Sequence, residues 1–562
     1  MFEKLLTPLV YLLVFFCFSN IQCKRDTSYV AVDTVVVRLA AEPEQVDPLL
    51  ARTLADRQLN NLLFLGLLDY DPQTLELIPV LVETLPAVDA ITNGPWRGGM
   101  QYHFTIRPEA TWDNGNPVTA ADYIFTFKTL LNPGVNAAPF RIYFNFLKDI
   151  IADPLNPKKF TVFTDRPYVM ALEALGTVGL YPAYHYDKNH LLNDIPITNL
   201  TDAERVDSIY KNTAALQKFA EDFNNKDPHK TIGGSAYQIS EWIANQRIIL
   251  TKKKEHWTET VPILSSIPER LVFKIIPDVN SALSLLQSQE LDIITGIPPD
   301  RFEDLKKELQ ADYNFYTPPK LSYDYIGING NRDQLADVNV RRALAHLVDV
   351  NLIISEIWNG QAQRTVGPIH PSKSYYHPDL RPTKFDINRA DSLLKTHGPG
   401  TDNKRLQLRY FYNIKNEKAG EIGLLLNKIA KAVNIEIVPT GMEIKALLTN
   451  YRARDYDLIY LTWTTPPGLD DLRQTWHSSS NVAGGSNRTG FGDKNSDQII
   501  DQIRISYDSK TRKELYLRIQ EIIYQEQPYI FLYTPYERMA VHKRFAIQPT
   551  VRYPGYTIGK LK

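Results

Sequence analysis

The stretch that decides the fold is residues 102–127, which read YHFTIRPEATWDNGNPVTAADYIFTF. Its first six residues alternate between apolar and polar side chains, as a half-buried strand does. Asn114-Gly115 then marks a tight turn, because both residue types adopt positive φ at low cost. Thr119 followed three residues later by Asp122 is a variant of the capping box that begins a helix. The stretch therefore predicts a strand, a tight turn and a capped helix.

These signals resemble a family pattern, F-x-L-R-x-x-x-x-W-x-D-G-x-P-x-T-A-x-D. The pattern is shared by the large extracytoplasmic solute-binding proteins of ABC importers, the oligopeptide-, dipeptide- and nickel-binding family. Five further segments resemble patterns of the same family in the same order: 42–48, 62–69, 233–257, 291–293 and 337–344. Because the matches are collinear over nearly the whole mature chain, the sequence is identified as a member of this family.

The resemblance implies an α/β protein with a two-lobed, periplasmic-binding-protein-like fold of type II. An extra third domain and a ligand cleft between the lobes belong to that fold. The expected division is lobe I from 32–66, 184–275 and 526–562, the extra domain II from 67–183, and lobe II (domain III) from 276–525. Region 187–230 is polar and is interpreted as an insertion with a surface helix near 203–223.

From residue 406 the pattern becomes regular without help from the resemblance. The expected elements are a strand at 406–412, a helix at 419–432, a strand at 435–438, a helix at 444–453 and a strand at 456–463. Alternating strands and helices with short connections predict a right-handed parallel unit. Earlier in the chain, the spacing of apolar residues predicts one helix over 337–357, and 34–39 reads as a strand.

The composition is that of a globular protein that buries large cores, with 43% apolar, 11% aromatic and 23% charged residues. The net charge is −1. The main basic cluster, Lys252-Lys253-Lys254, is interpreted as a solvated strand edge. The charge therefore excludes nucleic acid as a partner.

Ten consecutive apolar residues, 9–18, follow Lys4 near the N-terminus. A helix that spans a bilayer needs about twenty, so this run is typical of the apolar core of a secretory signal. We expect a signal peptide at 1–22 and a tether at 23–31. The protein is thus expected to be exported, to the periplasm or the cell surface.

Both cysteines, Cys17 and Cys23, lie in or just after this segment, so the mature domain has no disulfide framework. A cysteine directly after the apolar run indicates a bacterial lipoprotein, cut before Cys23 and anchored to a membrane by lipid on its sulfur. Residues 20–22, Asn-Ile-Gln, depart from the usual lipobox. The alternative is an ordinary cleaved signal.

No enzyme motif is present in the sequence. It contains no His-Glu-x-x-His, no Gly-x-Ser-x-Gly, no phosphate loop and no closely spaced His or Cys pair with zinc geometry. The glycine-rich segment 484–492 does not match a dinucleotide fingerprint and is interpreted as a surface loop. We therefore expect no catalysis, no cofactor and no metal site.

The resemblance instead implies a binding site at Thr462-Trp463-Thr464, the end of a predicted strand. In peptide-binding relatives the matching strand end offers backbone groups to an extended peptide, and its tryptophan lines a side-chain pocket. Such strand addition tolerates many sequences, because main-chain hydrogen bonds supply the affinity. The alternative is that Trp463 is a core aromatic at the end of a buried strand.

The chain departs from the family pattern just beyond this strand. Peptide-binding relatives read W-x-x-D, where the aspartate pairs with the ligand's ammonium, and here Pro466 occupies that place. A buried ammonium without a partner costs several kcal/mol in order of magnitude. Either Asp470 or Asp471 supplies the charge, or the ligand has no free amine there. Alternatively, the two aspartates only cap the next helix.

Five other residues match ligand-facing positions of relatives. They are Arg52, Asp56 and Arg57 in the segment 51–57, Glu443 near the place of a cleft aromatic, and Tyr533 in Phe531-Leu532-Tyr533. A solvated glutamate at a helix start is the alternative for Glu443.

Together these observations predict a monomeric substrate-binding lipoprotein of an ABC import system. It would capture a peptide-like solute between its lobes and deliver it to a permease and ATPase complex. The alternatives are a ligand-sensing binding protein, or a binder of a non-peptide solute such as an oligosaccharide or a metal chelate.

Overall fold

The computed structural model describes residues 33–395 and 405–558. The expected signal peptide at 1–22, the tether at 23–31 and Cys23 lie outside the described residues. Within them, the strands form sheets of seven, six, four and two strands. These sheets and the helices that cover them confirm the expected α/β class.

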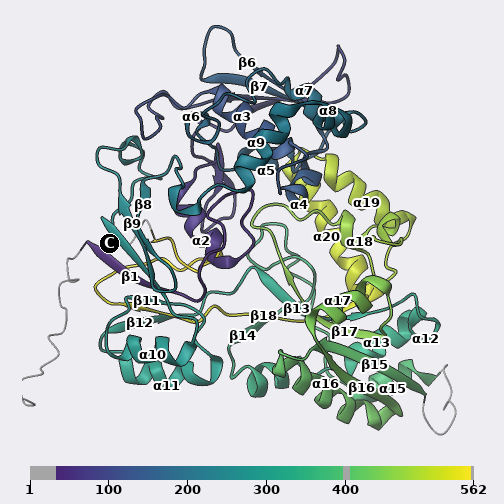
Figure 1. Ribbon diagram of the computed structural model, residues 1–562. Helices are drawn as coiled ribbons and strands as arrows, with labels where there is room; N and C mark the ends of the chain where they lie inside the picture. The colour runs from purple at the N-terminus through teal and green to yellow at the C-terminus, as the bar shows by residue number, and fades with distance from the viewer. Residues whose placement is uncertain (1–32, 396–404, 559–562) are drawn as a thin grey trace, which may run out of the picture.

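The seven-stranded sheet joins the N-terminal strand to segments from the middle and the end of the chain. Its order is β12 (Tyr313–Tyr316), β19 (Met539–His542), β11 (Ile293–Ile294), β1 (Thr34–Leu39), β10 (Arg270–Ile275), β9 (Arg247–Lys252) and β8 (Tyr237–Ile243). Strand β1 runs parallel to β10 and β11, and it begins and ends where the sequence predicts. Helices α10 (Val279–Gln287) and α11 (Pro299–Leu309) bury apolar residues against this sheet (Figure 1).

The six-stranded sheet contains the regular unit expected from residue 406. Its order is β14 (Ala362–Arg364), β18 (Tyr529–Pro535), β13 (Ser322–Ile328), β17 (Leu458–Thr464), β15 (Leu406–Asn413) and β16 (Ile435–Met442). Strand β15 is parallel to both β16 and β17, as the alternation predicts. The helices of the unit are α16 (Glu417–Ala430) and α17 (Ile444–Ala453).

The opening stretch lies in the four-stranded sheet and the helix packed on it. The sheet order is β4 (Ala87–Ala90), β5 (Met100–Thr105), β7 (Lys159–Thr164) and β6 (Leu147–Ala152). Helix α3 (Ala120–Leu131) follows β5, and the Asp122 carboxylate accepts the backbone N–H of Thr119 at 2.9 Å, as a capping box requires. The predicted strand and capped helix are thereby confirmed.

The remaining elements cover the sheets and connect them. They are β2 (Leu68–Tyr70), β3 (Leu77–Pro79), α2 (Leu54–Leu63), α4 (Ala138–Arg141), α5 (Ala171–Gly176), α6 (Ala183–Tyr186), α7 (Ile197–Thr201), α8 (Val206–Asn212), α9 (Ala214–Asn224), α12 (Asp333–Ala336), α13 (Val338–His346), α14 (Val350–Leu352), α15 (Ile387–Leu393), α18 (Arg473–Trp476), α19 (Lys494–Ile505) and α20 (Ser509–Glu526). Short turns of helix are η2 (Ile142–Phe144), η3 (Pro228–Lys230), η4 (Trp257–Thr260), η5 (Ile353–Ile357), η8 (Lys431–Val433) and η9 (Ser478–Ser480). Among the described residues, no helix combines the length and apolarity needed to cross a bilayer.

Two expected helices are interrupted. The helix predicted over 337–357 ends at His346, and Asp349 begins a new turn by accepting the backbone N–H of Leu352 at 3.0 Å. The surface helix expected near 203–223 is divided into α8 and α9 at Thr213, whose backbone is extended.

Strand pairing differs from two of the expected lobe boundaries. Strands β11 and β12 lie after residue 276, yet they pair in the seven-stranded sheet with β1 and β19. Strand β18 lies after 526, yet it pairs with β13 and β14 in the six-stranded sheet. Placing 276–316 in lobe II and all of 526–562 in lobe I was therefore wrong, because hydrogen bonding between distant strands decides which sheet each joins.

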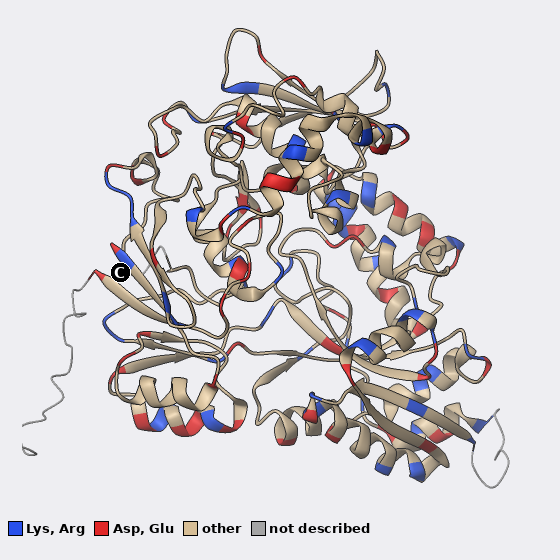
Figure 2. Cartoon of the chain, viewed as in Figure 1, with Lys and Arg blue, Asp and Glu red and all other residues tan. Residues whose placement is uncertain are grey.

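The basic triplet is not a solvated strand edge. Lys252 forms ion pairs with Glu259 and Glu269 at 3.1 and 3.4 Å. Lys253 is buried and donates to the Asp113 carboxylate at 2.6 Å and to the Gly233 carbonyl at 2.8 Å. Figure 2 shows residues of both charge signs interspersed along the chain. Lys253 therefore ties the tight turn of the opening stretch to the end of β9, while Lys254 is exposed.

Replacing Asp113 tests this connection. Burial lowers the pKa of Lys253, and Asp113 opposes that effect. Asp113→Ala leaves a buried ammonium without its counter-ion, so we expect a loss of about 3 kcal/mol in the free energy of unfolding. Chemical denaturation measures this loss. Asp304→Ala, at an exposed ion pair with Lys307, is the control and should change stability little. Equal effects of the two variants would contradict the assignment.

Candidate ligand-binding site

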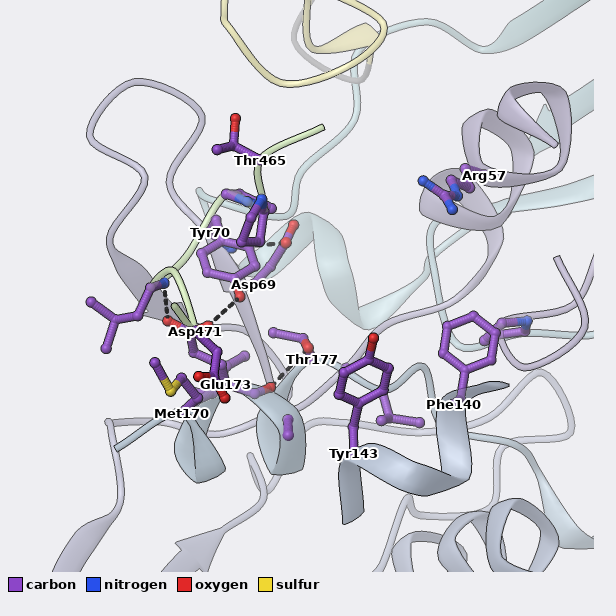
Figure 3. A pocket seen from close by; sticks show the side chains of 18 of the residues that line it. Arg57, Asp69, Tyr70, Phe140, Tyr143, Met170, Glu173, Thr177, Thr465 and Asp471 are labelled. Carbon is purple, nitrogen blue, oxygen red and sulfur yellow. Dashed lines mark hydrogen bonds between the residues drawn. The ribbon is translucent and has the colours of Figure 1, made fainter. Parts of the chain in front are cut away.

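A cavity of about 910 Å³ lies where region 48–80 and region 130–179 face the end of β17 and the loop that follows it. Most of its lining is apolar or aromatic, with a few charged groups at defined places. Its volume lies within the range of small-molecule and peptide pockets. Figure 3 shows Tyr70, Glu173 and Asp471 on one side of the view, and Arg57 on the other.

The structure brings the predicted strand end to this cavity. Trp463 is half-buried and lines the cavity together with Thr464. Thr462 is exposed, and its hydroxyl donates to Asp324 at 2.6 Å instead of lining the cavity. Trp463 also packs against the buried cluster that contains Tyr323 and Trp476, so it contributes to this core and lines the cavity.

The backbone of β17 is open on one side at this place. Antiparallel pairing with β13 continues to Ser322↔Thr464. On the other side, β15 pairs only as far as Phe411↔Ile459. Among the described residues, no strand pairs with that second edge of β17 beyond Ile459. The edge leads directly to the cavity wall at Trp463 and Thr464.

Asp470 lines the cavity but already has a partner inside the protein. Its carboxylate accepts Lys373 Nζ at 2.7 Å and the Tyr375 hydroxyl at 3.0 Å, and the side chain is buried. Burial raises the pKa of Asp470, and the ammonium of Lys373 opposes that rise. The expected role of Asp470 as a partner of the ligand's amine is not supported, since Lys373 already neutralises its charge.

Asp471 is also committed within the protein. One carboxylate oxygen accepts the Tyr168 hydroxyl at 3.0 Å and lies 3.4 Å from Arg504 Nε. The other accepts the backbone N–H of Arg473 at 3.0 Å, at the start of α18. The helix-capping alternative thus describes Asp471 better than the amine-binding one.

Two other expected ligand residues are structural. Asp56 is fully buried and accepts the backbone N–H groups of Glu44, Arg52 and Thr53, each at 2.8 Å, which fixes the start of α2. Tyr533 is fully buried, and its hydroxyl lies 2.7 Å from that of Tyr460. Neither lines the cavity. The expectation for both was wrong because they were placed by alignment, which does not register burial.

Arg52 and Glu443 also lie away from the cavity lining. Arg52 is exposed and donates to the carbonyl of Asn136 at 2.7 Å. Glu443 is exposed just before α17, as its solvated alternative predicts. Fewer of the predicted residues therefore line the cavity than the sequence analysis expects.

Glu173 is a cavity residue that sequence reasoning missed. It lies on α5, where its carboxylate accepts the backbone N–H of Leu469 at 2.7 Å and the Tyr70 hydroxyl at 3.2 Å. Burial raises its pKa to about 7, although these two hydrogen bonds and the charge of Lys373 oppose the rise. The only sign of this role in the sequence is that Glu173 is the one charged residue of the apolar segment Ala171–Gly176.

Arg57, expected in the ligand-facing loop 51–57, does line the cavity, together with aromatic residues that sequence reasoning missed. Arg57 is exposed on α2 and lines the cavity, and its guanidinium forms no hydrogen bond or ion pair with any described residue. Phe140 and Tyr143, on α4 and η2, line the same cavity. Tyr143 is 49% exposed.

Hydrogen bonds join the two walls of the cavity. The backbone N–H of Val169 donates to the Arg504 carbonyl at 2.7 Å, and the hydroxyls of Tyr102 and Tyr507 lie 2.9 Å apart. Together with Glu173 and Leu469, these contacts connect region 67–183 to the part of the chain built on the six-stranded sheet. The extra region is thus part of the cavity wall and not only a scaffold.

An α/β chain with two large sheets and a ligand-sized cavity has the architecture expected of a two-lobed binding protein. The sequence pattern of bacterial extracellular solute-binding proteins, family 5 Middle, matches residues 90–485. The chain belongs to this family. Membership confirms the resemblance stated above and the expectation of a binding protein that is not an enzyme.

Individual relatives agree with this assignment. The chain is 24% identical to the oligopeptide-binding protein AppA of Bacillus subtilis (strain 168) over 521 residues, which are 90% of this chain and 87% of that protein. The structure of AppA in complex with a nonapeptide is 22% identical, with a TM-score of 0.66 over 94% of this chain and 98% of AppA.

Two further structures share the fold. HbpA2 from Haemophilus parasuis has a TM-score of 0.75 at 19% identity, covering 94% of this chain and 100% of that one. NikZ from Campylobacter jejuni in complex with Ni(L-His) has a TM-score of 0.66 at 20% identity, covering 92% and 95%. The expected fold class is therefore confirmed.

The raised pKa of Glu173 predicts a pH-dependent stability. The carboxylate is near its usual pKa of 4.5 when unfolded and near 7 when folded, so the folded state holds its proton more tightly. This contribution to stability is complete below pH 4.5 and is lost as the pH rises to about 7. It amounts to at most about 3 kcal/mol.

Glu173→Gln removes the titration and keeps the shape. We expect the difference in unfolding free energy between pH 5 and pH 8 to be smaller in the variant by about 1–3 kcal/mol, measured by urea denaturation. The titratable groups that face Glu173 are present in both proteins; they are Tyr70, Lys373, Tyr375, Asp470 and Tyr516. An unchanged pH dependence would refute the prediction.

Proposed function

We propose that the chain is the substrate-binding component of an ABC import system and that it captures a peptide in the cavity. It then delivers the peptide, as a monomer, to a permease and ATPase complex. The two large sheets would be the cores of two lobes, with region 67–183 as the extra domain that completes the cavity wall. Relatives named as oligopeptide-binding proteins support this reading.

The open edge of β17 is the observation that carries the proposal. Beyond Ile459 this strand is paired only with β13 among the described residues, and its free edge meets the cavity at Trp463. An extended peptide can add to such an edge through main-chain hydrogen bonds, while its side chains enter the surrounding volume. The apolar lining, including Phe140 and Tyr143, suits side chains of many kinds.

Binding between two lobes would also drive closure. A ligand shifts an open–closed equilibrium only by its difference in affinity for the two states. Here the ligand would touch Trp463 on one wall and α5 on the other, contacts that exist together only when the walls are close. A micromolar affinity corresponds to about −8 kcal/mol.

Native mass spectrometry of protein purified without refolding tests the ligand class. We expect a heterogeneous set of bound peptides, and Trp463→Ala should retain them about tenfold less because an aromatic wall of the cavity is lost. Trp96→Ala, which removes a half-buried tryptophan that packs on Phe163 outside the cavity, is the matched control. A single non-peptide adduct of defined mass would overturn the proposal of a peptide.

We further infer that Cys23 anchors the mature protein through lipid. The support is its place directly after the apolar run. Cys23→Ser should move the protein from the membrane fraction to the soluble extracytoplasmic fraction, as followed by fractionation and by the mass of the mature chain. A wild-type protein without an acyl mass on Cys23 would exclude the anchor and leave the ordinary cleaved signal.

A further inference from the structure

The cavity contains one carboxylate that the protein itself does not neutralise. Three others have cationic partners: Asp69 pairs with Arg552 at 2.8 Å, Asp470 with Lys373 at 2.7 Å, and Asp471 lies 3.4 Å from Arg504. Glu173 forms no ion pair with any described residue. We propose that Glu173 binds a primary ammonium of the ligand. The inference rests on the proposed function and names the group by which the cavity recognises a peptide.

The geometry around Glu173 holds its carboxylate in one place. Leu469 N–H and the Tyr70 hydroxyl donate to it at 2.7 and 3.2 Å, one to each oxygen. A Cβ placed on Gly468 would lie 2.3 Å from both oxygens, so the carboxylate rests directly against the glycine backbone. A carboxylate oxygen accepts two hydrogen bonds, so each oxygen keeps one acceptor position that no described residue fills.

The nearest cation cannot serve as the counter-ion. Lys373 Nζ is held by the Asp470 carboxylate and by the Gly468 carbonyl, each at 2.7 Å. Its charge reaches Glu173 only through space, and burial still outweighs it, which leaves the pKa of Glu173 raised to about 7. A cation that arrives with the ligand would meet a carboxylate that is desolvated, oriented and uncompensated.

The chemistry of this site favours an ammonium as the ligand group that Glu173 binds. A compact ammonium with three donors needs only the remaining positions. In a peptide, such a group is either the α-amine or a lysine side chain.

Peptide pools in which the amines are either free or blocked test the inference. Casein is digested with Glu-C protease to give four pools: unmodified, lysine blocked before digestion, α-amines blocked after digestion, and both blocked. Each pool is passed over immobilised wild-type protein, and retained peptides are quantified by mass spectrometry. We expect the wild type to retain at least one of the pools with a free amine about tenfold more than the fully blocked pool. Comparing the retention of the lysine-blocked pool with that of the α-amine-blocked pool identifies which amine is bound.

Glu173→Gln is the decisive variant, because the amide oxygen still accepts a hydrogen bond and the size is kept. We expect it to retain all four pools about equally. Glu83→Gln, at an exposed glutamate outside the cavity, should keep the wild-type preference. Melting temperatures of all three proteins establish that they are folded.

The outcomes separate the two proposals. Equal retention of blocked and free pools by the wild type, or a preference that survives in Glu173→Gln, overturns the role of Glu173 and leaves peptide binding intact. Retention of no pool by the folded wild type overturns peptide binding itself, and the inference falls with it.

Discussion

A buried ion pair between Lys373 and Asp470 holds the loop that the binding site depends on. The ammonium also donates to the Gly468 carbonyl, and the Tyr516 hydroxyl donates to the Asp470 carbonyl at 2.7 Å. These contacts fix both ends of the segment 468–470, and between them the backbone N–H of Leu469 donates to Glu173 on the opposite wall. The loop is thereby a rigid wall, and the opposite wall docks on it through Glu173.

The charges of the cavity follow from the cost of burying them. A buried carboxylate needs a cation or several hydrogen bonds to offset its desolvation. Asp470 and Asp471 are satisfied by lysine or arginine from the same part of the chain, whereas Glu173 reaches the loop from another part and finds only neutral donors. The other carboxylates in the described cavity lining are thus paired with cations of the protein. Glu173 and the exposed Arg57 line the cavity without an ion-pair partner among the described residues.

Local signals predicted the elements whose determinants lie within a few residues. The capping box at Thr119 and Asp122, the strand Thr34–Leu39 and the helix Ile444–Ala453 all form where the sequence places them. Such features depend on hydrogen bonds between near neighbours and on apolar periodicity. The expected lobe boundaries were less accurate. Strands β11, β12 and β18 pair with strands that are, in several cases, more than two hundred residues away in the sequence.

The candidate site shows even more clearly what local sequence signals cannot predict. Trp463 was found because a motif carries it, and Asp56 and Tyr533 were misplaced because the same kind of match cannot distinguish an exposed side chain from a buried one. Glu173 carries no motif at all. By itself, the sequence determined the family, the elements with local signals and the strand that ends at the cavity. Only the tertiary structure decided which carboxylates are neutralised, because the partner of each charge lies on a different segment and burial is a property of the packed whole.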